Sequence, residues 1–312
     1  MTTFKVLLVP AMLLAMVPSV FAQAMPPWSR GENNPAASKG YVFQVGDVDN
    51  VPDLHGNPEN AALVLFIGGN QFFVLPRLIA GFEKLHPELR GAIFYETLPP
   101  GILRRQMANN NTLTLGNLTL RVQPDVFEAG ANALAGMERN KIVEKAVRYT
   151  SNDLAIMVKA SNPKHIRSLR DLARPDVRLS MPNPEWEGVA RQIAISLRKA
   201  GGDALYRAVY ETKARNHSTF VTHVHHRQTP MRILRGDSDA GVTWTSEVRF
   251  QQMIGNPIAG VDIPSDQNFT GIYAAGVLRD APHPAAARAW VAYLTTPQAQ
   301  AVYKEFGFKP AR

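Results

Sequence analysis

Apolar residues first form a regular pattern after residue 60. Residues 62–67 are an uninterrupted apolar run, ALVLFI, which is typical of a buried strand. Gly68-Gly69-Asn70 ends this run, and apolar residues then recur at helical spacing up to Leu85, before Pro87. Residues 92–97 predict a second strand, which Pro99-Pro100-Gly101 ends before another helical stretch at 102–107. The chain therefore repeats the order strand, turn, helix.

The same alternation continues to the end of the chain. Further strands are predicted at 125–127, 153–160, 177–181, 240–244 and 271–278. A helix is predicted around Val189, with a stop at Gly201-Gly202, and two more begin at Pro284 and Pro297. Residues 109–120, NNNTLTLGNLTL, predict a polar hairpin or an insertion. Strands that alternate with helices indicate an α/β fold with a parallel or mixed sheet covered by helices.

The first 60 residues differ from the rest. Residues 1–24, MTTFKVLLVPAMLLAMVPSVFAQA, have the order of a secretory signal peptide: one lysine, an apolar run, then small residues. The run is too short to cross a bilayer, which takes about 20 apolar residues. Residues 25–60 are rich in Pro, Asn, Gly and Asp and predict a solvated N-terminal arm that carries Asp53 and His55.

The composition excludes several classes of function. The sequence has no cysteine, which excludes disulfides, thiol catalysis, cysteine-ligated metal and lipid attachment through an N-terminal cysteine. The formal net charge is +8, but the basic residues are scattered and no basic run is interleaved with aromatic residues. This pattern disfavours nucleic-acid binding, whereas a mild positive charge helps to capture small anions.

Three stretches carry a family resemblance. They are VLFIGGNQFFVLPRLIAGFEKLHPEL, MPNPEWEGVARQIAISLRKAG and the tail AAGVLRDAPHPAAARAWVAYLTTPQAQAVYKEFGF. Together with the element order, they resemble the type II periplasmic binding proteins, most of all the molybdate-binding type, over residues 61–308. The resemblance implies two α/β lobes with a ligand cleft between them. Lobe 1 would comprise residues 61–152 and 271–312, and lobe 2 residues 153–270, with strands 153–160 and 271–278 as the hinge connections.

The resemblance also implies where the ligand binds. The positions that it assigns to ligand contact are Asn70, Pro99, Pro100, Gly101, Gly188, Val189, His226 and Trp244, and we add Gly69 from the turn after the first strand. General physics supports a cleft at these turns independently. Ligands of open α/β sheets lie beyond the carboxyl ends of the strands, and helix N-termini offer free N–H groups to anions.

The stretch FVTHVHHRQ, residues 220–228, admits several interpretations. In the first, His223, His226 and Arg227 donate to an anion, and His225 points away. In the second, His223, His225 and His226 bind a transition metal together with Glu96. In the third, the histidines form a polar loop without ligand contact.

An enzyme on the same fold is a further alternative, in which His223 pairs with Glu96 or Asp239. The sequence contains no nucleophile elbow, P-loop or dinucleotide fingerprint. We therefore expect a binding protein that needs no cofactor. By the resemblance, it is a monomeric periplasmic receptor that delivers a small anion, an oxyanion or an organic acid, to the membrane permease of an ABC importer.

Overall fold

The structure is a computed structural model that describes residues 43–44, 52–115, 118–223 and 225–311. The predicted signal peptide, residues 1–24, and most of the predicted arm lie outside these residues. Within the described part of the chain, no helix is long and apolar enough to cross a membrane.

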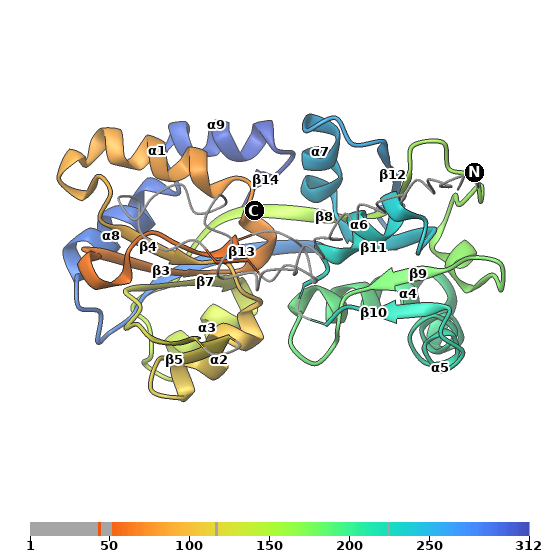
Figure 1. The fold of residues 1–312 in the computed structure, drawn as a ribbon, viewed down its shortest axis with the longest axis horizontal. Helices are drawn as coiled ribbons and strands as arrows, with labels where there is room; N and C mark the ends of the chain where they lie inside the picture. The colour runs from red at the N-terminus through yellow and green to blue at the C-terminus, as the bar shows by residue number, and fades with distance from the viewer. Residues whose placement is uncertain (1–42, 45–51, 116–117, 224, 312) are drawn as a thin grey trace, which may run out of the picture.

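Lobe 1 is built on a mixed sheet with the strand order β1-β2-β4-β3-β7-β13 (Figure 1). β3 is parallel to β4 and β7, whereas β13 is antiparallel to β7. The strands are β1 Phe43–Gln44, β2 Pro52–His55, β3 Leu63–Ile67, β4 Ile93–Glu96, β7 Val126–Gly130 and β13 Thr270–Val277. Helices α1 and α9 lie on one side of this sheet and α2 and α3 on the other (Figure 1). The helices are α1 Leu75–Leu85, α2 Pro100–Ala108, α3 Ala131–Arg139, α8 Pro284–Tyr293 and α9 Pro297–Glu305.

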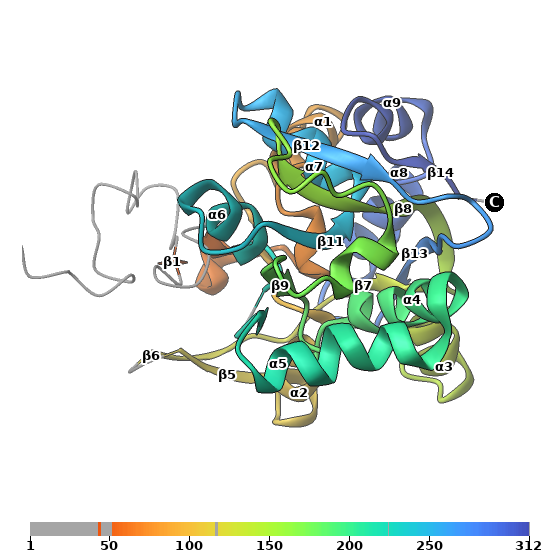
Figure 2. The ribbon, with the colours of Figure 1, turned by 90° about the vertical axis from the view of Figure 1, so that its right-hand side faces the viewer.

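Lobe 2 continues the sheet in the order β8-β11-β9-β10, with β12 also paired to β8. Its strands are the second part of β8 Val147–Lys159, which begins in lobe 1, and β9 Leu179–Met181, β10 Thr219–Val221, β11 Ala240–Trp244 and β12 Ile258–Asp262. Its helices are α4 Gly188–Arg207, α5 Lys213–Arg215, α6 Gln228–Arg235 and α7 Thr245–Met253. The long helix α4 runs along the lower side of the lobe (Figure 2).

The strand β8 connects the lobes. Up to Asp153 it pairs with β13 in lobe 1, and from Leu154 onward it pairs with β11 and β12 in lobe 2. The chain returns to lobe 1 between β12 and β13. β13 begins at this boundary, where Thr270 pairs with Asp153 and Gly271 with Asn152, and it pairs with β7 of lobe 1 from Tyr273 onward. The role of residues 271–278 as the second hinge connection stays a prediction. The hairpin predicted at 109–120 is confirmed as β5 Thr112–Leu115 and β6 Leu118–Arg121, which extends away from lobe 1 (Figure 2).

Local patterns explain most elements. All five residues of β3 are buried, as a continuous apolar run predicts. The helix α1 buries Leu75, Leu78 and Phe82, one face at helical spacing. In α4 the first helical run ends at Gly201-Gly202, as predicted, because Gly202 has a φ of 68°. Helical geometry then resumes and continues to Arg207.

The end of the predicted N-terminal arm requires a correction. Residues 52–55 are not a solvated strap but the strand β2, which pairs antiparallel with β4. The side chain of His55 stacks on Tyr95, with 4.3 Å between ring centroids. Asp53 is 1% exposed, because its carboxylate points into the junction of the two lobes.

An aromatic cluster joins the lobes beside the crossing strands. Phe73 of lobe 1 stacks on Phe250 of α7 with 4.8 Å between ring centroids, and Phe72 meets the same ring edge-on. Phe306 also packs against Phe73. Burial of aromatic rings is a large source of stability, so this cluster fixes one side of the interlobe junction.

Candidate functional site

A cleft of about 810 Å³ lies between the two lobes. Its walls include the turns after β3, β4 and β7 in lobe 1 and the first turn of α4 in lobe 2. The lining residues of these turns are Gly68, Gly69, Asn70, Pro100, Gly101, Ala131, Asn132, Gly188 and Val189. Parallel strands β3, β4 and β7 thus direct their carboxyl ends toward the cleft, which is where open α/β sheets bind ligands.

Three helices begin at this cleft. They are α2 at Pro100, α3 at Ala131 and α4 at Gly188. The first N–H groups of a helix have no partner inside it and carry a partial positive charge. In none of these three helices does the N-cap side chain accept a hydrogen bond from the first turn. These N–H groups can therefore donate to an anion in the cleft.

The charged side chains of the cleft leave a positive excess. Its arginines are Arg104, Arg148 and Arg191. All three are exposed, and none forms an ion pair with a residue in the described part of the chain. The two carboxylates among the lining residues are already paired, Glu185 with Arg105 at 3.0 Å and Glu187 with His226. The field in the cleft therefore attracts anions.

The lobes touch around the cleft, so it is a bounded space. A Cβ on Gly101 of lobe 1 would lie 2.7 Å from the carbonyl oxygen of Trp186 in lobe 2. A Cβ on Gly271 would lie 2.4 Å from the ring of Trp244. Such distances are shorter than any side chain tolerates, so glycine at these two positions permits the close approach of the lobes.

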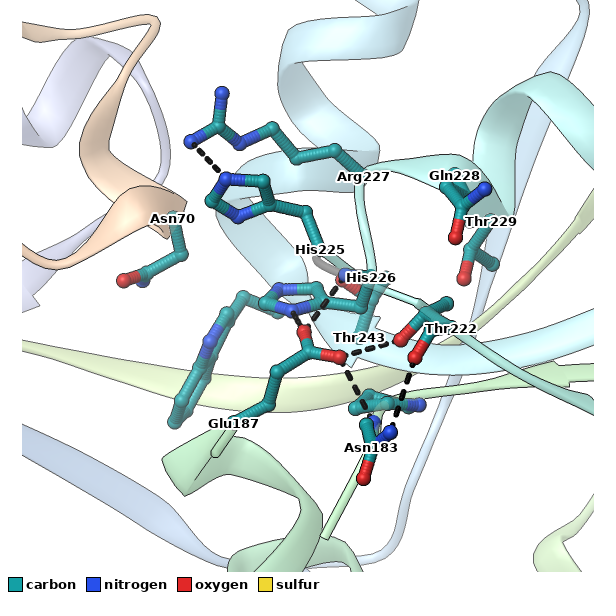
Figure 3. A network of polar contacts seen from close by, with 12 residues as sticks. Asn70, Asn183, Glu187, Thr222, His225, His226, Arg227, Gln228, Thr229 and Thr243 are labelled. Atoms are coloured by element: carbon teal, nitrogen blue, oxygen red, sulfur yellow. Dashed lines mark hydrogen bonds and ion pairs between the residues drawn. The ribbon is translucent and has the colours of Figure 1, made fainter. Parts of the chain in front are cut away.

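His226 lies at the floor of the cleft between two glutamates of its own lobe. Its Nδ1 contacts the Glu187 carboxylate (Figure 3). Its Nε2 lies 3.0 Å from Glu247. Burial alone would lower the pKa of His226, but the charges of Glu247 and Glu187 outweigh it and raise this pKa to about 10. The imidazole is therefore charged near neutral pH, with both N–H groups engaged by protein carboxylates.

The Glu187 carboxylate is held by several donors. It accepts from the backbone N–H groups of Asn183, at 2.8 Å, and His226, at 2.7 Å. The hydroxyl of Thr222 and Nδ1 of His226 donate to it as well (Figure 3). A carboxylate has about four lone-pair positions, so these donors saturate Glu187. We call Glu187, His226 and Glu247 the floor cluster.

Arg227 and His225 extend in the opposite direction, toward lobe 1 (Figure 3). Nη2 of Arg227 lies 2.9 Å from the Asp53 carboxylate and also donates to the carbonyl oxygen of Thr97. Nε2 of His225 lies 3.1 Å from the same carboxylate. Burial would raise the pKa of Asp53, but the charges of His225 and Arg227 outweigh it and lower this pKa to about 2. We call Asp53, His225 and Arg227 the interlobe clasp.

Phe72 and Gly69 pack closely against the interlobe clasp. The guanidinium carbon of Arg227 lies 4.4 Å from the ring centroid of Phe72, a cation–π arrangement. A Cβ on Gly69 would lie 2.5 Å from the carbonyl oxygen of Thr97 and 2.7 Å from His225. Gly69 is therefore needed where the turn after β3 passes the clasp.

The structure brings most of the predicted site residues together. Those that line the cleft are Gly69, Asn70, Pro100, Gly101, Gly188, Val189, His226 and Trp244. The Asn70 side chain donates to the hydroxyl of Tyr273, and Trp244 lies 5.8 Å from the ring of Tyr273. Their role in ligand binding stays a prediction.

Three predictions on the histidine stretch need correction. His223 is exposed, packs against Phe220 and does not line the cleft. Arg227 is buried in the interlobe clasp and is not among the cleft-lining residues. His225 does not point away but is 1% exposed, lines the cleft and contacts Asp53. The physical reason is that α6 begins at Gln228, so His225, His226 and Arg227 form a buried entry to this helix.

The alternative metal site is not formed. His225, His226 and His223 point to three different surroundings, and Glu96 is buried with the Gln106 amide 2.9 Å away. Within the described residues, no group of three or more His, Asp or Glu side chains has a geometry that could hold a metal ion. The suggested acid–base pairs are not formed either, since Asp239 contacts Arg178 at 3.2 Å instead of His223.

The cleft also contains residues that sequence reasoning missed. These are Arg104, Arg148, Arg191, Glu187 and Tyr273. Glu187 and Arg191 lie in the PNPEWEGVAR turn and first helical turn, which the resemblance had already assigned to the site. The position of Glu187 directly before a helix that was expected to face the cleft was a usable signal. Arg148 and Tyr273 gave none, because they lie on strands whose register only the fold determines.

Two α/β lobes joined by crossing strands, with an electropositive cleft between them, define a type II periplasmic binding protein. The resemblance found in the sequence is thereby confirmed, as is the two-lobed α/β fold. Residues 63–309 match the family described as bacterial extracellular solute-binding protein, and the chain belongs to this family.

Two named relatives align with part of this chain. The molybdate-binding protein ModA of Mycobacterium tuberculosis is 28% identical over 182 residues, 58% of this chain and 59% of its own. A sulfate-binding protein of Synechococcus elongatus is 26% identical over 168 residues, 52% of this chain and 48% of its own. The chain thus spans about half to three-fifths of the length of the curated relatives it matches.

Solved structures agree on the fold. The sulfate-binding protein SubI from Mycobacterium tuberculosis superposes with a TM-score of 0.64 at 19% identity, covering 80% of this chain and 86% of that one. The Azotobacter vinelandii periplasmic molybdate-binding protein gives a TM-score of 0.63 at 15% identity, covering 80% and 100%. At these identities the likeness concerns the fold alone.

Proposed function

We propose that this protein is the solute receptor of an ABC importer and that its cleft binds a small anion, either an oxyanion or an organic acid. The observation that carries the proposal is the convergence of three helix starts on a cleft whose unpaired side-chain charges are positive. The sulfate-binding and molybdate-binding relatives are consistent with an anionic ligand.

The location and the partner belong to the same proposal. The signal pattern and the missing cysteine support export through residues 1–24 and a periplasmic location without a lipid anchor. Membership of the solute-binding family supports a receptor that docks on a membrane permease, and we propose that it does so as a monomer. The protein binds its ligand without chemical change, so the ligand is recovered intact after dissociation.

A thermal-stability screen tests the proposal. A ligand that binds only the folded protein raises the unfolding free energy by about 2.7 kcal/mol at a hundredfold excess over its dissociation constant. The panel contains sulfate, molybdate, phosphate, and mono- and dicarboxylates. We expect at least one of these anions to raise the melting temperature, and Arg191→Glu to abolish the shift by placing a negative charge in the cleft.

The matched control is Arg288→Glu, which changes the charge by the same amount. Arg288 lies outside the cleft, exposed and 2.7 Å from Glu144. An equal loss in both variants would mean that net charge, and not the cleft, sets the response. A panel in which no anion stabilises the protein would refute the proposed function.

A further inference from the structure

The cleft offers hydrogen-bond donors at two depths. Its inner wall is formed by buried groups: Asn70 is 8% exposed, Val189 5% and Trp244 4%. The arginines Arg104, Arg148 and Arg191 are exposed and lie nearer solvent. A ligand held by both sets must reach from the floor to the rim.

The size of the cleft supports such a ligand. Its volume of about 810 Å³ lies in the range of roughly 300–1,000 Å³ that is usual for pockets that hold organic molecules. The lobes already touch at Gly101 and Trp186 and at Gly271 and Trp244, so this volume does not come from widely separated lobes. A single tetrahedral oxyanion would leave most of it to water.

The chemistry of the lining indicates what the ligand carries. Among the described lining residues, the one serine or threonine is Thr270, and its hydroxyl donates to Asp153 at 2.5 Å. The remaining donors include backbone N–H groups, amides, indole N–H groups, the Tyr273 hydroxyl and guanidinium groups. Guanidinium groups match planar carboxylates and phosphoryl groups in bidentate geometry.

The walls between these donors are partly apolar. Trp244, Tyr273 and Phe269 present rings to the cleft, and Ile272 and Ile195 add aliphatic surface. An apolar ligand body would cover these rings, which an inorganic anion cannot do.

We propose, on the basis of the proposed function, that the ligand is an organic anion with two separated acidic groups. One acidic group binds at the inner wall, to the Asn70 amide and the first N–H groups of α4 at Gly188 and Val189, and the other binds the rim arginines, with Arg191 contributed by lobe 2 and Arg104 and Arg148 by lobe 1. The carbon body between the two acidic groups lies against Trp244 and Tyr273.

Calorimetry with a graded series of probes tests this inference. The probes are butyrate, succinate, glutarate, adipate, phosphonoacetate, sulfate and molybdate. We expect the best two-acid probe to bind about tenfold more tightly than butyrate, which corresponds to about 1.4 kcal/mol, because its second acidic group adds charge-assisted hydrogen bonds to the arginines. Arg191→Gln should remove most of this advantage while butyrate affinity changes by less than about twofold. Arg288→Gln, outside the cleft, should change neither affinity.

The outcomes separate this inference from the proposed function. If sulfate or molybdate binds more tightly than every organic probe, the ligand class is wrong but the anion receptor stands. Equal affinity for butyrate and for all two-acid probes would also overturn the two-group ligand. If none of the probes binds, both the inference and the proposed function fail.

Discussion

His226 and Arg227 are neighbours in the chain, yet their side chains serve different parts of the molecule. His226 contacts Glu187 and Glu247, so the floor cluster lies entirely within lobe 2. Arg227 contacts Asp53 and the carbonyl oxygen of Thr97, so the interlobe clasp joins lobe 2 to lobe 1. Adjacent residues thus have different roles: His226 is a buried charge at the floor of the cleft, and Arg227 forms an ion pair between the lobes.

The difference teaches that a cluster of cations in a sequence need not act on a ligand. Both residues are positively charged, but each is neutralised by buried carboxylates of the protein. The donors that we propose for anion binding in the cleft are instead helix N–H groups and exposed arginines. The floor cluster should therefore govern stability, whereas the interlobe clasp should also govern how tightly the lobes close.

The largest effect is expected from His226→Leu. This change leaves Glu187 and Glu247 buried and facing each other without the cation between them. Breaking a buried ion pair by removing one partner costs about 3–5 kcal/mol of unfolding free energy. Urea denaturation measures it, with His223→Leu as the control, because His223 is exposed and should change stability by less than about 0.5 kcal/mol. An unchanged urea midpoint for His226→Leu would contradict the buried floor cluster.

A smaller loss of stability, with a change of shape, is expected from Asp53→Asn. The amide keeps the size of the side chain but removes the charge that Arg227 and His225 contact. We expect a loss of about 1–3 kcal/mol, the cost of leaving buried partners poorly satisfied. Small-angle scattering of the ligand-free protein should show a larger radius of gyration, since the lobes lose a buried tie.

Arg105→Gln is the matched control for Asp53→Asn. It removes another interlobe ion pair, with Glu185 at 3.0 Å, but both side chains are more than half exposed. Exposed pairs contribute about 0–1 kcal/mol, so this variant should remain compact. If Asp53→Asn is as compact as Arg105→Gln, the interlobe clasp does not hold the lobes together.

The sequence predicted the parts of the fold that depend on short-range patterns. The run of β3, the glycine turn at residues 68–70 and α1 follow one another within 25 residues and each has its own signal. The contacts of the two clusters have no such signal. His226 meets Glu187 across 39 positions, and Arg227 meets Asp53 across 174. A turn-rich composition at residues 25–60 made Asp53 look solvated, whereas pairing of β2 with β4 buries it.

The same long-range contacts explain why the histidine predictions were partly wrong. Histidine titrates near pH 6.5 in water, which makes a charged or neutral state in a loop equally plausible from sequence. Two buried glutamates remove that ambiguity for His226. Neither glutamate stands near it in the chain, so the pairing could not be predicted from the sequence pattern.

The last prediction uses pH to separate the floor cluster from the interlobe clasp. His226 has a folded pKa of about 10, raised from 6.5, so its contribution is complete below about pH 6.5 and is lost as the pH rises toward 10. Asp53 has a folded pKa of about 2, so its contribution is present above about pH 4 and is lost as the pH falls through 2. The two clusters therefore fail at opposite ends of the pH range.

Unfolding free energies measured from pH 6.5 to 10 should decline in the parent and in Asp53→Asn. In His226→Gln the decline should be smaller by at least about 1.4 kcal/mol, the equivalent of one pKa unit. Glu96 also contributes to the decline in unfolding free energy over this pH range, because burial raises its pKa to about 8. The parent and His226→Gln are therefore compared in a Glu96→Gln background. If His226→Gln declines as steeply as the parent in that background, His226 is not held charged by its glutamates. The contrast between the two clusters would then be lost.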